Sequence, residues 1–454
     1  MTRSGRIWNE VRATAAVAAP LAGASVAQMA MGFTDTVMVG RLGAVPLAAA
    51  GLGATLYFTA TVALQAIVSA VAPLAAHAAG RGDTAGAGRI AGEGLVIALL
   101  VSLPFVLAIT FFDRLLVVLG YEPALAAEVA RFLRAIAWGA PAFLAFAALR
   151  SLLAALSRTR PVMVVLLFCV AANAALNWVL IYGHLDFPAL GIEGSGYASA
   201  ISQWLMLLGL MLYIEWVPSL RALRVFRNMA SRDWSEMGRI ARLGAPIGGM
   251  VALENGVFLT AGVLVGLFGA AALGANQIVL NCAAFTFMVP LGIGQAATVR
   301  VAFENGAGNA AGARRAAFVA LAMGVAFMTA AAVMLWTVPR AIIAVYVDAS
   351  DPANRKVVEI ALRLMGVAAL FQVVDGTQTA AAGALRGYKD AAVPMLYAAI
   401  GYWAIGFAGG WLLAFPFGFG PVGLWWGLAL GLAVVAALLT ARLHRLSSQR
   451  PVLT

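Results

Sequence analysis

The feature that most constrains this chain is a series of long apolar segments, each about as long as a bilayer is thick. A transmembrane helix needs about 20 mainly apolar residues. Twelve such segments follow one another, at about residues 14–38, 46–73, 91–112, 128–150, 160–183, 190–216, 240–266, 271–300, 315–338, 357–382, 391–414 and 420–442. Charged residues make up 11% of the chain, against roughly 25% in soluble proteins. The sequence therefore predicts an all-α, multi-pass membrane protein with twelve transmembrane helices.

The positions of Lys and Arg predict how these helices are oriented. With the N-terminus in the cytoplasm, 22 of the 30 Lys and Arg residues fall on the cytoplasmic side. Cytoplasmic loops of membrane proteins are enriched in these residues. Because the number of spans is even, we expect both termini in the cytoplasm and a bacterial-type inner (plasma) membrane. The net charge of +11 then indicates topology, and no nucleic-acid partner is expected.

The two halves of the sequence repeat each other. Shifted by 226 residues, the repeat offset, they align without a gap over about seventy positions, pairing Ala19-Pro20 with Ala245-Pro246 and Val39-Gly40 with Val265-Gly266. Six spans per half give both halves the same orientation, so a pseudo-two-fold axis should run along the membrane normal. We expect an N-terminal lobe at 1–220, a basic cytoplasmic linker at 221–242 and a C-terminal lobe at 243–454. Such lobes can move against each other to give alternating access. The matched prolines fit either a static bend or a bend that changes during transport.

Three acidic residues, Asp35, Glu254 and Asp375, lie within the apolar segments. A carboxylate at the bilayer centre costs about 2.5–3.5 kcal/mol on insertion scales. Acids retained at that cost usually handle cations or protons. The alternative is that an acid close to a helix end, above all Asp35, reaches interfacial water. The repeat does not extend to the acids, which predicts unequal roles for the two lobes.

Polar and aromatic residues on the same segments complete the candidate site. Asn173 and Asn177 share a helix face, and with Asp35 they could bind a cation or proton. The alternative is plain interhelical hydrogen bonding. Aromatic rings could hold a flat cation by cation–π contact, or simply pack. The candidate substrate-binding residues are Gln28, Asn255, Phe258, Gln277, Asn281, Phe371 and Gln378.

Several other classes of function are disfavoured. The sequence has no G-x-x-x-x-G-K-[ST] phosphate-binding loop, so an ion gradient is the expected energy source. A membrane enzyme would need a nucleophile–base pair or a metal set, and no such pattern is visible. We therefore expect a monomeric transporter, not an enzyme, without a cofactor.

Four segments carry a resemblance to a known family: MGFTDTVMVGRLGAVPLAAAGLG, VAPLAAHAAGRGD, EGSGYASAISQW and GALRGYKDAAVPM. They resemble the NorM-like branch of the multidrug and toxic compound extrusion family, and the resemblance covers nearly the whole chain. It implies an antiporter that confers drug resistance by exchanging Na⁺ or H⁺ for small cationic compounds.

Residue by residue, the resemblance assigns the coupling role to Asp35, Glu254 and Asp375, with Asn173 and Asn177 beside the first acid. It implies a Na⁺ site at Glu254 and Asp375, or at Asp35. Phe371 stands where the family often has a hydroxyl-bearing aromatic residue, and this favours protons at the C-terminal acids. The alternative function is a flippase for a lipid-linked precursor, as in a related branch, which would want basic residues in its cavity.

Overall fold

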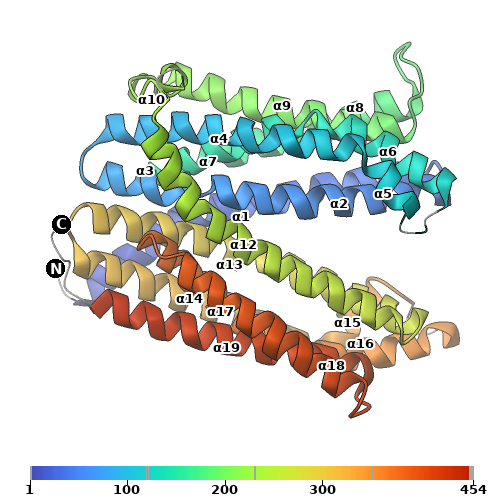
Figure 1. Cartoon of the computed structure of the whole chain (residues 1–454). Helices are drawn as coiled ribbons and strands as arrows, with labels where there is room; N and C mark the ends of the chain where they lie inside the picture. Colours follow the sequence, from blue (N-terminus) through green and yellow to red (C-terminus); the bar gives the residue numbers. More distant parts are fainter. Residues whose placement is uncertain (1–2, 119, 121, 230–231, 349–350, 449–454) are drawn as a thin grey trace. The chain divides into compact units, whose positions relative to one another are not determined.

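The computed structural model describes residues 3–118, 120, 122–229, 232–348 and 351–448, and within them it contains helices and no strand (Figure 1). The first half comprises α1 (Arg3–Gly40), α2 (Ala44–Val68), α3 (Val71–Gly80), α4 (Thr84–Thr110), α5 (Phe112–Val118), α6 (Pro123–Ala137), α7 (Ala140–Ala155), α8 (Arg160–Tyr182), α9 (Ile192–Trp216), α10 (Pro218–Arg221) and α11 (Val225–Asn228). The second half comprises α12 (Trp234–Gly266), α13 (Ala270–Gly306), α14 (Ala310–Thr337), α15 (Pro339–Ala344), a 3₁₀ turn (Pro352–Asn354), α16 (Arg355–Gly387), α17 (Ala392–Ala398), a π-helical stretch (Ala399–Phe407), α18 (Ala408–Ala414) and α19 (Gly420–Ser448). The predicted all-α fold is confirmed.

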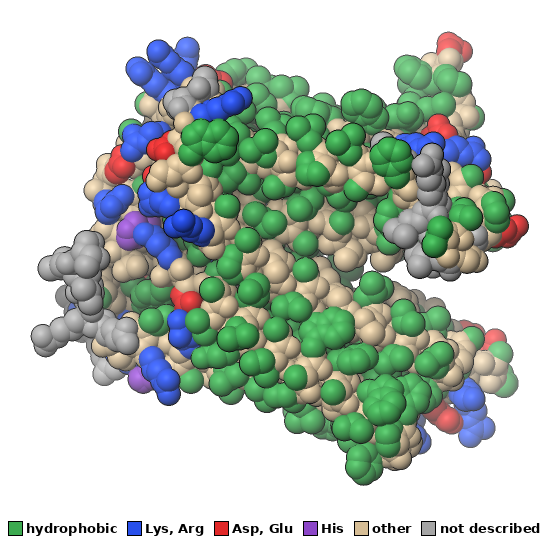
Figure 2. Space-filling view, viewed as in Figure 1, with side chains coloured by type: hydrophobic (Ala, Val, Ile, Leu, Met, Phe, Trp, Pro, Cys, Tyr) green, Lys and Arg blue, Asp and Glu red, His purple; other side chains and the backbone are tan. Residues whose placement is uncertain are grey.

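The predicted spans correspond to these helices. Eleven described stretches are single spans by length and composition, and the pair α6–α7, bent by 45°, makes a twelfth. That pair occupies the predicted fourth span, 128–150. Figure 2 shows hydrophobic side chains along the lengths of the helices and Lys and Arg gathered at helix ends. This distribution is typical of a membrane protein, because lipid tails cannot solvate charge.

The internal repeat recurs in the turns and caps. Gly43 and Gly269, separated by the repeat offset, have φ values of +119° and +96° before α2 and α13, a backbone region open to glycine. Asp83 caps α4 by accepting from the Gly86 amide, and Asn309 caps α14 by accepting from the Gly312 amide. The same offset relates these two caps. The two halves therefore share local chain geometry as well as sequence.

The described chain packs as two compact units. Unit 1 comprises Met1–Ala22 and Gly249–Thr454, and unit 2 comprises Gly23–Gly248. The breaks at Ala22 and Gly248 occupy matching positions of the repeat, just after the matched prolines. The units thus differ from the predicted lobes by exchanging the first parts of α1 and α12. The predicted ranges also include residues 1–2, 230–231 and 449–454, which lie outside the described residues, as do the two termini.

The predicted linker is folded onto unit 2. A Cβ added at Gly88 of α4 would lie 2.2 Å from the Leu223 carbonyl oxygen, and one at Gly92 would lie 2.9 Å from the Val225 oxygen. The Glu93 carboxylate accepts a hydrogen bond of 2.7 Å from the Asp233 amide. The linker therefore packs backbone to backbone against the outer face of α4.

Candidate functional site

Unit 2 gathers polar groups from three helices around Asp35. The Asn177 amide of α8 donates to Asp35 Oδ1 at 2.5 Å, and the Ser199 hydroxyl of α9 donates to Oδ2 at 2.7 Å. Asn177 also donates to Asn173 Oδ1 at 3.2 Å. The structure thus brings Asp35, Asn173 and Asn177 together. The two donors stabilise the charged carboxylate, and no cationic side chain pairs with it among the described residues.

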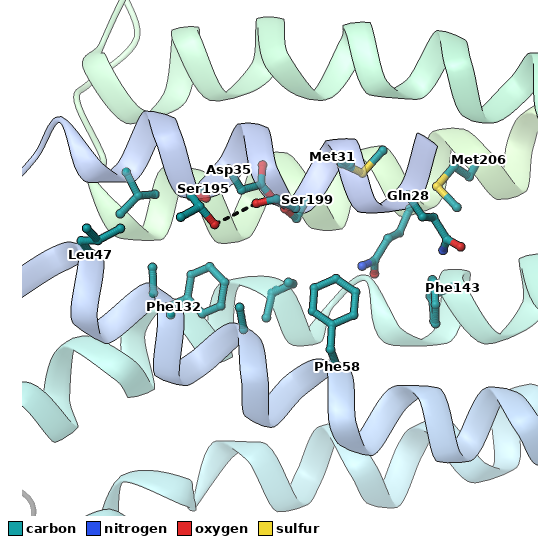
Figure 3. A pocket seen from close by; sticks show the side chains of 18 residues that line it. Gln28, Met31, Asp35, Leu47, Phe58, Phe132, Phe143, Ser195, Ser199 and Met206 are labelled. Atoms are coloured by element: carbon teal, nitrogen blue, oxygen red, sulfur yellow. Dashed lines mark hydrogen bonds between the residues drawn. The ribbon is translucent and has the colours of Figure 1, made fainter. Parts of the chain in front are cut away.

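A cavity of about 60 Å³, partly open to the outside, lies beside this cluster. Figure 3 shows Asp35 with Ser195 and Ser199, and Phe58 and Phe132 on the facing helices. Gln28 and Asp35 both line the cavity, as expected from their seven-residue spacing. The lining residues are Gln28, Met31, Gly32, Asp35, Thr36, Val39, Leu47, Ala50, Gly51, Ala54, Phe58, Phe132, Ile136, Phe143, Ser195, Ser199, Gln203 and Met206.

The sequence reasoning missed the polar residues that α9 contributes. Ser195, Ser199 and Gln203 recur every fourth position, so they form one stripe on the helix, and all three line the cavity. The Tyr57 hydroxyl donates to Gln203 Oε1 at 3.0 Å and so orients this amide. A polar stripe at helical spacing in an apolar segment is the signal that would have identified them.

Unit 1 holds the other two acids. Glu254 on α12 and Asp375 on α16 interact electrostatically, and both interact with Tyr402 of the π-helical stretch. Glu254 also interacts with the Arg386 guanidinium. Asp375 is 6% exposed, and its Oδ1 has no hydrogen-bond partner within the described chain. The same holds for both side-chain polar atoms of Gln372, one helical turn earlier, which the sequence reasoning also missed. Buried polar atoms without protein partners are the donors and acceptors that a bound ion or water would satisfy.

The other predicted residues lie at varied places in unit 1. Phe371 is 3% exposed and makes edge-to-face contacts with Phe258 and Trp425, so its ring is packed on both sides. Gln277 is exposed and donates to Asn281 at 3.1 Å. Gln378 is buried and approaches Tyr402, whereas Asn255 is half-buried. Phe371 has no hydroxyl that could bind an ion, but the Tyr402 hydroxyl interacts with both acids.

A second cavity in unit 1 is the repeat counterpart of the Asp35 cavity. It has a volume of about 10 Å³ and is lined by Phe258, Ala261, Gly262, Val265, Asn276, Leu280, Leu424, Trp425 and Leu428. At the repeat offset, Phe258 takes the place of Gly32, Leu280 that of Ala54, and Ala261 that of Asp35. Larger side chains therefore fill the space that unit 2 leaves open, and the acid is lost. The two halves, for which unequal roles were predicted, thus differ in the size and the charge of this cavity.

Comparisons with known proteins agree with the repeat and the fold. The family described as MatE matches residues 20–179 and 246–412, two ranges that begin at the matched prolines. A probable multidrug resistance protein NorM from Mesorhizobium japonicum is 41% identical over 96% of this chain and 94% of its own length. The multidrug resistance protein NorM of Burkholderia vietnamiensis is 42% identical over 95% of this chain and 93% of its own. The crystal structure of the eukaryotic MATE transporter AtDTX14 superposes with a TM-score of 0.86 at 22% identity, covering 98% of this chain and 99% of that one.

The fold and the buried acids thus describe a two-unit helical membrane protein built from a repeat. The chain belongs to the MatE family.

Proposed function

We propose that this protein is a cation-coupled antiporter that exports small cationic, amphipathic compounds from a bacterial cell. Its coupling ion is H⁺ or Na⁺, and the two units move against each other to give alternating access. Support comes from relatives that are named multidrug resistance proteins and from the acid sites of this chain. Transport, not catalysis, is the activity proposed.

The observation that carries the proposal is Asp35 at the wall of an aromatic-lined cavity. One carboxylate with two neutral donors can take a proton or a small cation, or it can face an organic cation. A single negative charge cannot neutralise the coupling ion and the organic cation at the same time. Mutually exclusive occupancy of one carboxylate is sufficient to couple inward movement of the ion to outward movement of the compound.

The aromatic side chains supply the second part of substrate recognition. Phe58, Phe132 and Phe143 line the same cavity as Asp35. Flat apolar cations combine a charge for the carboxylate with a surface that packs on aromatic rings. We therefore assign the cation-binding role to Asp35 and the broad apolar selectivity to the phenylalanines.

The acids of unit 1 form a second coupling site in this proposal. Glu254 and Asp375 present a pair of interacting carboxylates beside Gln372 and Tyr402. Two carboxylates with oxygen donors nearby suit either a shared proton or Na⁺. The alternative of a flippase for a lipid-linked anionic precursor has less support, because the described residues lining the Asp35 cavity include an acid and neither Lys nor Arg.

Efflux from proteoliposomes tests the proposal. A fluorescent cationic dye is loaded. An inward Na⁺ gradient is imposed at equal pH on both sides, and, in a separate experiment without Na⁺, an inward H⁺ gradient is imposed. We expect gradient-dependent dye efflux that Asp35→Asn lowers at least tenfold, because the amide keeps the shape but cannot exchange charge. Glu254→Gln and Asp375→Asn should lose the response to the coupling ion.

Asp83→Asn is the matched control. Asp83 caps α4 through a side-chain oxygen that asparagine also has, so efflux should be unchanged. The proposal fails if Asp35→Asn transports the dye as well as Asp83→Asn does.

A further inference from the structure

A groove on unit 1 lies outside the proposed transport sites. It runs between α14, α16 and α19, has a volume of about 610 Å³ and is largely open. Its lining residues are Phe318, Thr377, Ala436, Ala437, Thr440, Ala441, His444 and Arg445. From Ala436 to Arg445 it extends about 14 Å along α19 at 1.5 Å per residue. That is about half of a hydrocarbon core roughly 30 Å thick. The groove therefore has the length of one leaflet.

Two unpaired arginines flank one end of the groove. The Arg314 guanidinium lies 5.7 Å from the centroid of the Phe318 ring, and the His444 ring meets the same phenylalanine edge-to-face. Neither Arg314 nor Arg445 forms an ion pair with the described chain. At the same end of unit 1, Arg300 pairs with Glu10 and Arg442 pairs with Asp390. The groove thus has a free positive end.

The lining of the groove is largely apolar. Thr440 belongs to it, but its Oγ1 atom is buried and so is closed to a ligand in the groove. The remaining lining is mostly alanine and phenylalanine. A ligand that suits the groove is an apolar chain with an anion at one end.

The repeat shows why protein does not fill this groove as it fills the equivalent place in unit 2. The counterparts of Arg314 and Phe318 are Gly88 and Gly92, the two glycines against which the linker packs. Because Arg314 and Phe318 carry side chains where α4 has glycine, no backbone can approach α14 as closely as the linker approaches α4. A flexible acyl chain needs no such close backbone contact.

We propose that this groove binds an anionic phospholipid. One acyl chain lies between α14 and α19, and the phosphate sits on Arg314 and Arg445. The predicted orientation places this site in the cytoplasmic leaflet, where basic pockets between helices bind anionic head groups. Thr377 lines the groove two residues from Asp375, so the lipid packs on the outer face of the acid-bearing helix.

Native mass spectrometry of the delipidated full chain tests the site. Phosphatidylglycerol and phosphatidylcholine with identical acyl chains are titrated in parallel. We expect preferential retention of phosphatidylglycerol, which Arg314→Gln/Arg445→Gln lowers roughly tenfold or more. Arg340→Gln/Lys356→Gln removes the same charge from exposed positions at the other end of α14 and α16, and it should retain the lipid normally.

A truncated chain tests whether the C-terminal residues of the protein occupy the groove. A chain ending at Ser448 should bind as the full chain does. Equal loss in the two charge-removal variants, or retention that requires residues 449–454, overturns the proposal. None of these measurements depends on transport.

Discussion

At the scale of single residues, the candidate sites depend on which donors surround each acid. Asp35 accepts from Asn177 and Ser199, so two neutral groups stabilise its charge. Asp375 has an oxygen without a hydrogen-bond partner and a second carboxylate nearby. In the proposed mechanism, the first environment suits a single charge that is exchanged, and the second suits an ion or a proton shared between two acids.

Removing the Ser199 hydroxyl should change the pH dependence of transport. A hydrogen bond to a charged group contributes about 1.5–3 kcal/mol, so Ser199→Ala makes the charged form of Asp35 harder to maintain. We expect the midpoint of the pH–efflux profile to move upward by about one unit or more, because Asp35 then keeps its proton at higher pH. Dye efflux measured from pH 5 to 9 gives this midpoint.

Ser202→Ala provides the comparison on the same helix. The Ser202 hydroxyl donates to the Ala198 carbonyl oxygen and is fully buried, away from Asp35. Its pH profile should match that of the unmodified protein. Coincident profiles for the Ser199 and Ser202 variants would mean that the Ser199 contact plays no part in coupling.

At the scale of elements, α1 is a helix that is divided between the two units. Its first part packs in unit 1, and the part that carries Asp35 packs in unit 2. Glu10, only 4% exposed, holds the first part through two hydrogen bonds from Arg300, of 3.0 and 3.1 Å. Arg300 also pairs with Glu304 at 3.1 Å. This buried ion pair secures the start of α1 to α13.

Breaking that pair should destabilise the protein. Glu10→Gln leaves the half-buried guanidinium of Arg300 without one of its two carboxylates, and loss of one partner of a buried pair costs about 3–5 kcal/mol. We expect a clearly lower midpoint of thermal unfolding in detergent. Glu359→Gln, which breaks an exposed pair with Arg355, should cost less than about 1 kcal/mol. Equal midpoints for the two variants would show that the Glu10 network does not hold α1.

At the scale of the whole molecule, the repeat and the distribution of charge make the main prediction, the orientation in the membrane. Leu267 follows α12 and is 70% exposed, whereas Ser235 lies exposed at the start of the same helix. With Cys169 and Cys282 replaced by alanine, a membrane-impermeant maleimide applied to intact cells should label Leu267→Cys and not Ser235→Cys. Both should react after the cells are lysed. Labelling of Ser235→Cys in intact cells would reverse the predicted topology.

Much of the fold could be predicted because lipid imposes simple rules. Span length, the scarcity of charge and the constant offset between matched positions indicated the twelve helices and the parallel repeat. The bend between α6 and α7 and the π-helical stretch that carries Tyr402 were not predicted. The bend lies at Trp138 and Gly139, directly before Pro141 in the first turn of α7, so a local signal for it was present in the sequence. The apolar pattern alone does not distinguish a π-helical stretch from an α-helix.

The sequence by itself identified the three acids as the main candidates for a functional role, because a carboxylate in an apolar segment is costly to place in a bilayer. Only the tertiary structure decided which of them meet. It brought Asp35 into hydrogen-bonding contact with Asn177 and Ser199, which are far from it in the sequence. It also packed the Phe371 ring against Trp425. It also opened a cavity in unit 2 and filled its counterpart with Phe258 and Leu280. Spacing along a helix specifies a face, but only the packing of helices specifies what that face meets.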